Sequence, residues 1–494
     1  MLIVAVDDTD SREQGMCTTY VGARLAERLA ATGGRVRRRL LVRLNPAVKH
    51  KTRGNAAVAL HVSDVDPGAA FERAAETVRE FAAVDDPRTS PGVVVADLGA
   101  AAATADPRDP DGECVPDTPL PEGVAVPDDV AAFARRALRH RLALDDALDI
   151  ADGHGYRHAA FGTGGETPET AVAGRGRIGA LAAVGAAGAF DDWTVERISY
   201  RELDRCGTPR DVDAESVFAA ADRGYPVVWD TVDRDTGETV CVPNAPGPIL
   251  HGIRGDDAAA CREVAAAIES EPVERAAAFL TNQGTDAHLA DGVIGDLRDG
   301  AGYRVEGVVA SDPETKRGGH VHVDVAAPGA AGDRDWSDRD GRDEADTDST
   351  ALLRCVAFKP TGRFRDRVRA LRPGDRVTLC GEHEVRPATG DAGGDEAGGG
   401  GTATLKVEKF AVRDLRETER VVPTCPDCER SMSSAGRGQG YRCRDCGTDA
   451  PGKVDVGIDR DLELGWYEVP PSARRHVAKP LVRGGFDGPT HPER

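Results

Sequence analysis

The sequence predicts a multidomain α+β protein, and three features indicate this fold class. Apolar residues alternate between strand-like and helix-like periods over residues 1–97, and short strand-like runs dominate residues 275–415. Two closely spaced pairs of cysteines lie near the C-terminus. The chain has 494 residues, which at roughly 150 residues per domain corresponds to three or four domains.

The N-terminal region is expected to form an α/β unit. The period of its apolar residues predicts strands at 2–6, 38–44, 56–62 and 92–96 and helices near 19–31 and 69–83. Residues 98–128 are rich in alanine, aspartate and proline without an apolar period, so we expect an insertion or linker there. Helical patterns resume over 128–150, and a glycine-rich stretch covers 162–188.

The next segment, residues 194–273, is predicted to be a small ferredoxin-like unit. Its expected elements are strands at 195–199, 226–231, 239–242 and 249–253 and helices at 214–222 and 256–269. This mixed order of strands and helices suits such a unit.

Residues 274–416 are predicted to form a small β-barrel. The strand candidates are 303–309, 320–325, 352–358, 375–380 and 403–410, and acidic, glycine-rich insertions interrupt them at 327–350 and 387–402. Five short strands with long loops fit an OB-fold, a common fold for binding single-stranded nucleic acid. Any other small barrel fits the same pattern.

The composition is acidic and poor in lysine, as is typical of proteins from halophilic cells. The formal net charge is −21, and only eight of the 63 basic residues are lysines. At 1 M salt, charges are screened beyond about 3 Å. The net charge therefore does not exclude an RNA partner.

No secretory leader or membrane span is expected. The first strand-like run leads directly into acidic residues, and no apolar run approaches the roughly 20 residues that cross a bilayer. Seven of the eleven cysteines are scattered, which indicates reduced thiols. We therefore expect a cytoplasmic protein without a membrane partner.

The cysteine pattern predicts a zinc ribbon. Cys425 and Cys428 form one C-x-x-C pair, and Cys443 and Cys446 form the second. Two such pairs supply the four thiolates of a tetrahedral structural Zn²⁺ site. A redox pair or a chance spacing is the alternative.

Acidic residues follow the first predicted strand. Asp7, Asp8 and Asp10 stand at its C-terminal end, and Thr18 opens the next helix. Clustered carboxylates repel one another unless a cation such as Mg²⁺ holds them, and Mg²⁺ commonly binds both carboxylates and substrate phosphates. A solvated acidic loop is the alternative.

Two further segments are candidate phosphate-binding loops. The basic segment 43–55 has Lys51 and Arg53 beside a glycine, although a basic surface turn has the same composition. The segment 174–179 matches G-x-G-x-x-G. A poor preceding strand disfavours a nicotinamide site, which leaves phosphate contact or helix packing.

Two basic islands stand out in the acidic chain, at residues 359–369 and 474–483. Nucleic-acid phosphates are natural partners of such clusters. The candidate RNA-binding residues are Lys359, Arg363, Arg365, Arg369, Arg474, Arg475 and Lys479. The alternative is that these side chains neutralise acidic groups of the protein itself.

Together these motifs resemble the archaeal tRNA(Ile) 2-agmatinylcytidine synthetase family, and the resemblance runs nearly end to end. It is carried by residues 7–11 with 15–19, 43–46 with 51–55, 174–179, 249–255 and 281–286, then by the barrel and the ribbon. The insertions at 98–128, 327–350 and 387–402 depart from it and leave the motifs intact.

The resemblance implies four domains and a reaction. The domains are a kinase-like ATP domain over 1–193, a ferredoxin-like domain over 194–273, an OB-fold over 274–416 and a zinc ribbon with a basic tail over 417–494. The reaction is the ATP-dependent conjugation of agmatine to C2 of the wobble cytidine in the CAU anticodon of tRNA(Ile), which changes decoding to AUA.

The resemblance also implies residue roles. Asp7, Asp8 and Asp10 serve metal and base functions, with Asp7 and Asp8 on Mg²⁺, and Thr18 can accept a phosphoryl group. The implied ATP-binding residues are Asn45, Lys51, Arg53, Gly54, Asn55, Gly174, Gly176 and Gly179. Agmatine is the small-molecule substrate, and no obligate protein partner is evident.

Two other functional classes compete with this prediction. A non-catalytic nucleic-acid-binding protein requires only the barrel and the ribbon. A nucleotide-dependent oxidoreductase rests on the glycine motif alone.

Overall fold

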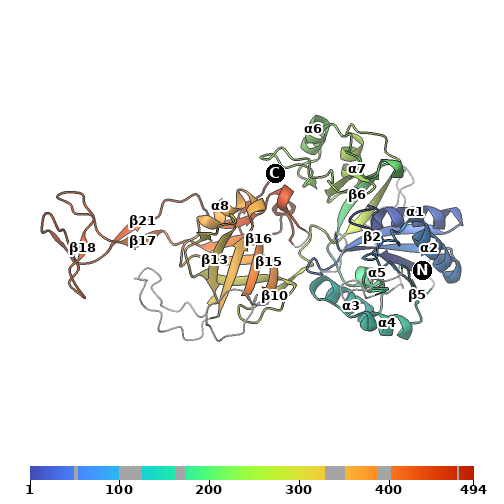
Figure 1. Ribbon diagram of the computed structural model, residues 1–494, viewed down its shortest axis with the longest axis horizontal. Coiled ribbons are helices and arrows are strands. Elements are labelled where there is room, and N and C mark those ends of the chain that lie inside the picture. Colours follow the sequence, from blue (N-terminus) through green and yellow to red (C-terminus); the bar gives the residue numbers. More distant parts are fainter. Residues whose placement is uncertain (49–53, 100–124, 163–172, 329–350, 387–401, 476–477) are drawn as a thin grey trace.

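The computed structural model describes residues 1–48, 54–99, 125–162, 173–328, 351–386, 402–475 and 478–494. In Figure 1 a larger α/β part carries the N-terminus, a β-rich part lies beside it, and a narrow C-terminal arm projects from the β-rich part. Among the described residues, no helix combines the length and apolar character needed to cross a membrane.

The α/β part is built on a nine-stranded sheet with the order β5-β4-β1-β3-β2-β9-β6-β8-β7. Its strands are β1 Leu2–Asp7, β2 Arg35–Arg43, β3 Ala56–Ser63, β4 Gly92–Asp97, β5 Arg157–Ala160, β6 Thr194–Tyr200, β7 Val228–Trp229, β8 Ile249–Gly255 and β9 Arg275–Thr281. The helices are α1 Thr18–Ala31, α2 Pro67–Phe81, α3 Asp128–Arg139, α4 Leu144–Gly153, α5 Gly176–Gly185, α6 Ala214–Gly224 and α7 Ala258–Ala266. The predicted N-terminal strands and helices are confirmed.

Strand β1 shows why the sheet forms here. All six of its residues are buried, and successive side chains enter opposite faces of the sheet. Leu2 and Val4 pack into a core with residues of α1 and α2, whereas Ile3 and Ala5 pack into a second core with residues of α3 and α5. The sheet is therefore covered on both faces, which leaves the C-terminal end of β1 to present polar residues.

Three details differ from the sequence-based expectation. The helical run 128–150 is two helices, α3 and α4, because the backbone becomes extended at His140. The predicted strand 239–242 is a turn, in which the Cys241 N–H donates to the Thr231 carbonyl. Strand β9, within the range predicted for the barrel, pairs with β6 and in parallel with β2 in the first sheet.

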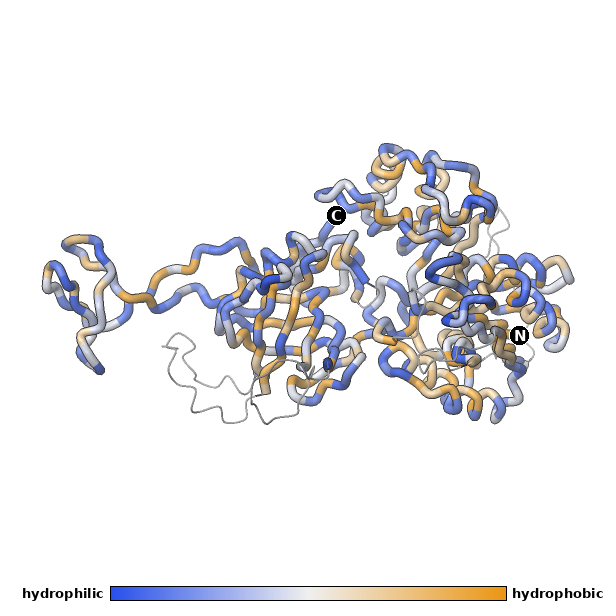
Figure 2. The backbone as a smooth tube through the Cα atoms, viewed as in Figure 1, coloured by the Kyte–Doolittle hydropathy of each residue, from blue (hydrophilic) through white to orange (hydrophobic). Residues whose placement is uncertain are grey.

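The β-rich part contains the second nine-stranded sheet. Its strands are β10 Leu289–Gly292, β11 Ala301–Val309, β12 Glu314–Thr315, β13 Val321–Ala326, β14 Leu352–Ala357, β15 Arg376–Arg386, β16 Thr402–Asp414, β22 Gly465–Glu468 and β23 Thr490–His491, and helix α8 covers Phe364–Arg369. The pairings β11-β13-β14-β16-β15-β11 close a five-stranded circuit, in which β14 and β16 are parallel. Figure 2 shows hydrophobic residues along these strands. The five predicted strands are confirmed.

The C-terminal arm leaves the barrel after β16 and returns at β22. Strands β17 Thr418–Val421 and β21 Val454–Gly457 pair along the arm, and three short strands, β18 Ser433–Ser434, β19 Tyr441–Arg442 and β20 Asp449–Ala450, form its tip. The tip contains a small core around Cys425, Met432 and Cys443.

Candidate active site

The C-terminal end of β1 opens into a cavity of about 450 Å³. Asp7, Asp8 and Asp10 line this cavity together with residues from the loop after β2, from the segment between α3 and α4, and from the start of α5. The remaining lining residues are Leu44, Val48, Gly54, Asn55, Ala137, His140, Arg141, Leu142, Ala143, Leu144, Arg175, Gly176, Ile178 and Gly179. Residues that the sequence analysis assigned to separate motifs therefore meet here.

The carboxyl groups of Asp7 and Asp8 are held in unusual environments. Burial raises the pKa of Asp7 well above its ordinary value, and the charge of Asp8 raises it further. Burial also raises the pKa of Asp8 to about 7, against the lowering effect of Arg175. The Asp8 carboxylate is 2.9 Å from an Arg175 guanidinium nitrogen and accepts a 3.1 Å hydrogen bond from the Ser90 N–H.

These two carboxyls fit a Mg²⁺ ion. Neighbouring buried acids cannot both ionise easily, and a divalent cation with oxygen preference removes that conflict. The backbone of Asp8 has a φ of 57°, in the left-handed region that non-glycine residues rarely adopt. A strained turn is thus maintained where the acids meet the cavity.

The glycines of segment 174–179 allow α5 to approach the acids closely. A Cβ on Gly179 would lie 1.9 Å from Asp7 Oδ2, and one on Gly176 would lie 2.9 Å from the Asp7 carbonyl oxygen. The Gly176 N–H donates to the Ser90 carbonyl at 3.1 Å, and the Gly174 N–H donates to Ser90 Oγ at 2.5 Å. Gly174 is not among the residues that line the cavity. These glycines serve close packing, and the cation in this segment is Arg175.

The loop after β2 divides between the cavity and the protein interior. Gly54 and Asn55 line the cavity, whereas Lys51 and Arg53 lie outside the described residues. Asn45 is 1% exposed and does not line it. Its side-chain amide donates to the Gly300 carbonyl at 2.9 Å and accepts from the Ala47 N–H at 2.8 Å. Asn45 therefore anchors the loop.

A second cavity of about 160 Å³ adjoins the first and shares Asp10 and Gly54 with it. Thr18 lines this second cavity and accepts a 3.1 Å hydrogen bond from the hydroxyl of buried Thr9. Arg43 and Arg210 line it too. Thr18 is thus separated from the Asp7 and Asp8 cavity by one shared wall.

Several functional candidates were missed from the sequence. Arg175 lies inside the glycine motif and could have been found there. His140 and Arg141 lie in the break between two helices that the apolar period merged into one. Arg210 carries no local signal, because it reaches the second cavity only through the fold.

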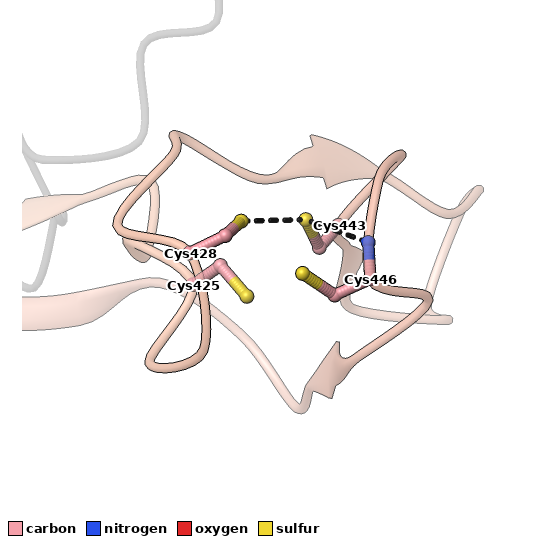
Figure 3. A group of neighbouring side chains, drawn as sticks. All are labelled: Cys425, Cys428, Cys443 and Cys446. Atoms are coloured by element: carbon pink, nitrogen blue, oxygen red, sulfur yellow. Dashed lines mark hydrogen bonds between the residues drawn. The ribbon is translucent and has the colours of Figure 1, made fainter.

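The four predicted zinc ligands converge at the tip of the arm, as Figure 3 shows. The sulfur atoms of Cys425, Cys428, Cys443 and Cys446 all lie within 4.8 Å of one another. In each pair, a backbone N–H after the second cysteine donates to the carbonyl of the first cysteine, Glu429 to Cys425 and Gly447 to Cys443. Four convergent sulfurs fit the soft, tetrahedral Zn²⁺ ligand set. Among the described residues, the aspartates of the main cavity form no comparably tight group.

Part of the predicted RNA surface is engaged in internal ion pairs. Arg363 pairs with Asp233 at 3.2 Å and with Asp235 at 2.9 Å. The side chain of Arg474 is 7% exposed and pairs with Asp230 at 2.7 Å and Glu468 at 2.6 Å. Arg475 pairs with Glu382 at 2.9 Å and with Glu408. For these three arginines the structure shows the alternative stated above, neutralisation of the protein's own acids.

The other members of the two islands are more accessible. Lys359 is exposed, and Arg365, Arg369 and Lys479 are half-buried. Arg365 donates to the Gly319 carbonyl, and Arg369 donates to Thr315 Oγ1 at 3.1 Å.

Three family models match the chain. The TiaS TCKD domain matches residues 3–163, the TiaS FLD domain matches residues 174–288, and the TiaS C-terminal zinc ribbon domain matches residues 422–462.

Full-length relatives show the same similarity. The tRNA(Ile) 2-agmatinylcytidine synthetase TiaS of Haloquadratum walsbyi is 48% identical over 518 residues, covering 100% of each chain. The corresponding protein of Methanosarcina mazei is 40% identical, covering 98% of this chain and 97% of the relative.

Two solved structures are similar along the whole chain. The complex of TiaS with its isoleucine tRNA and ATP has a TM-score of 0.76 at 34% identity, and the complex with tRNA, AMPCPP and agmatine has a TM-score of 0.74 at 32% identity. Each comparison covers 100% of this chain and 99% of the solved chain.

Proposed function

Because the chain belongs to the TiaS family of tRNA(Ile) 2-agmatinylcytidine synthetases, we propose that the cavity at the end of β1 is its ATP site. The protein is an ATP-dependent ligase that conjugates agmatine to the wobble cytidine of an isoleucine tRNA. The observation that carries the ATP-site proposal is the meeting of Asp7, Asp8, Arg175, Gly54 and Asn55 around one cavity.

The chemistry requires activation of the cytidine. Its C2 carbonyl oxygen is a poor leaving group, so a phosphoryl group from ATP is transferred to that oxygen. The agmatine amine then attacks C2, and the oxygen leaves with the phosphate. Phosphoryl transfer depends mostly on positioning and on charge neutralisation.

Asp7 and Asp8 would hold Mg²⁺, which offsets the negative charge on the transferred phosphoryl group. Arg175 stabilises the ionised form of Asp8 from 2.9 Å away. Asp10 lies between both cavities, where a carboxylate can accept a proton from the attacking amine. Gly54 and Asn55 lie where the loop after β2 faces the phosphates.

The second cavity is our candidate for the reacting nucleotide. It shares Asp10 and Gly54 with the ATP cavity, so a group bound there lies next to the phosphates. Arg43 and Arg210 favour a neutral or anionic occupant over dicationic agmatine. Thr18 at its wall is positioned as a candidate phosphoryl acceptor.

We assign the four domains with one adjusted boundary. The kinase-like domain precedes β6, and the ferredoxin-like domain extends through β9, because β9 pairs with β6. The closed circuit of five strands supports an OB-fold from β11 to β16. Lys359, Arg365, Arg369 and Lys479 remain the proposed RNA contacts, with Arg363, Arg474 and Arg475 assigned to internal pairing.

The ATP site is tested by Asp8→Asn, with the exposed Asp85→Asn as the matched control. We expect ATP turnover in the presence of tRNA to fall on the order of 10²-fold or more, because the cation site loses a carboxylate. The tRNA affinity should persist, since the barrel and ribbon lie outside the cavity. Near-normal turnover in Asp8→Asn would show that the acids are only a solvated loop.

A further inference from the structure

The motif at residues 281–286 lines neither cavity, although it is one of the segments that carry the family resemblance. We propose that Asp286 in this motif is a positioning residue for the RNA reaction, which fixes the barrel against the wall of the ATP cavity. The proposal rests on the proposed function for the identity of that cavity. The turn formed by residues 282–288 is called the joint below.

The joint binds a buried cation of the barrel. Lys409 belongs to β16, and its side chain is only 1% exposed. Its ammonium group is 3.1 Å from Asp286 Oδ1 and lies 4.6 Å from the ring centre of Phe486. Among the described residues, Asp286 is the carboxylate that pairs with Lys409. Removing one partner of such a pair leaves an uncompensated charge in a buried site.

Two other segments converge on the joint. Arg304 of β11 is 3.2 Å from Asp286 Oδ2. In the C-terminal tail, the Lys479 N–H donates to Asp286 Oδ1 at 2.7 Å, and Arg483 donates to the Gly284 carbonyl at 2.6 Å. Barrel and tail are therefore tied to one short turn.

The opposite side of the joint holds the cavity wall. The side chain of Asn282 accepts from the Arg43 N–H at 2.7 Å and donates to the Arg43 carbonyl at 3.0 Å. His288 Nε2 is 3.1 Å from the same carbonyl oxygen. The next residue, Leu44, lines the ATP cavity.

Helix α3 adds a second connection to that wall. Arg139 donates to the Ala287 carbonyl at 3.1 Å and to the Leu289 carbonyl at 3.0 Å. Its neighbours Ala137 and His140 line the cavity. A change at Asp286 therefore alters the position of RNA held on the barrel relative to the bound ATP, with no contact to either substrate.

The test is Asp286→Asn, with Asp291→Asn as the matched control on the exposed β10 of the same connection. In the full-length protein we expect kcat for agmatine transfer to fall about 10²-fold, as a misplacement of roughly 1 Å produces. The affinities for ATP and for tRNA, each measured by direct titration, should stay near wild type. Asp291→Asn should match the wild type in all three measurements. An unchanged kcat in Asp286→Asn overturns the proposal.

A second variant separates positioning from mere stabilisation. Asp286→Asn combined with Lys409→Met removes both charges, so no unpaired cation remains buried. We expect this double variant to regain thermal stability and to keep the low kcat. Recovery of the wild-type kcat would mean that Asp286 acts only on stability, which overturns the proposal. Failure of the proposed function is distinguishable, because the wild type would then lack ATP-dependent agmatine transfer as well.

Discussion

Gly179 shows how a residue without a side chain shapes the candidate active site. Its Cα lies against the Asp7 carboxylate, and an added methyl group would lie 1.9 Å from Asp7 Oδ2 and 2.8 Å from Leu44 Cδ1. Both of those groups line the ATP cavity. Their positions are therefore fixed by the absence of a Cβ on α5.

We predict that Gly179→Ala lowers ATP turnover about 10²-fold, because the carboxylate must move by roughly 1 Å. Steady-state kinetics with tRNA and agmatine measure this loss. Gly153→Ala is the control, since a Cβ there meets no atom within 4 Å. Equal activity of the two variants would mean that the position of Asp7 does not matter for turnover.

His61 is a buried residue whose charge state affects stability. It lies on β3 between Ile3 and Arg38, and among the described residues neither ring nitrogen has a hydrogen-bond partner. Burial, together with the charge of Arg38, lowers the pKa of His61 to about 3. The folded protein therefore binds fewer protons than the unfolded chain between pH 3 and 6.5, so stability is lost as the pH falls below 6.5.

We predict that His61→Leu removes this acid sensitivity. Between pH 6.5 and pH 5 the variant should lose about 2 kcal/mol less unfolding free energy than the wild type. Denaturant unfolding at several pH values, at constant high salt, measures the difference. Parallel pH profiles for the two proteins would contradict the assignment of His61 as a neutral buried group.

At the scale of elements, the zinc ribbon is the most self-contained unit. Its four sulfurs come from two tight turns that the sequence specifies within 22 residues, from Cys425 to Cys446. The core around them is small. A core of this size cannot hold three two-residue strands together by itself, so the metal must stabilise the tip.

We predict about one equivalent of zinc per chain in protein purified without added metal. Cys446→Ser should lose the zinc and the order of the tip, whereas Cys206→Ser, at a half-buried cysteine away from the ribbon, should keep both. Metal analysis and NMR of the ribbon resonances measure the two effects. A folded tip without zinc would refute the assignment.

The elements also show where sequence patterns lose information. The apolar period predicted β1 and α1 because each buries a face with its own repeat. The same period merged α3 and α4, since the break at His140 depends on backbone geometry. It also gave no sign that β9 joins the first sheet through β2, a pairing between residues far apart in the chain.

At the scale of the whole molecule, long-range partners decided which site predictions placed residues in the cavity. Asp8 and Gly54 reach the cavity because short motifs fix their local geometry. Asn45 instead bonds to Gly300, 255 residues away, and Arg474 pairs with Asp230 and Glu468. A basic cluster in an acidic chain predicts an RNA contact only when the protein's own acids lie elsewhere.

The joint implies an order of events during biosynthesis. Lys409 is made 123 residues after Asp286, and Lys479 is made 193 residues after it. At about 5–20 residues per second, the ribosome delivers the tail some 10–40 s after the joint. The N-terminal sheet is complete long before that time. A nascent chain can thus form the ATP cavity early, while the alignment with RNA awaits the last residues synthesised.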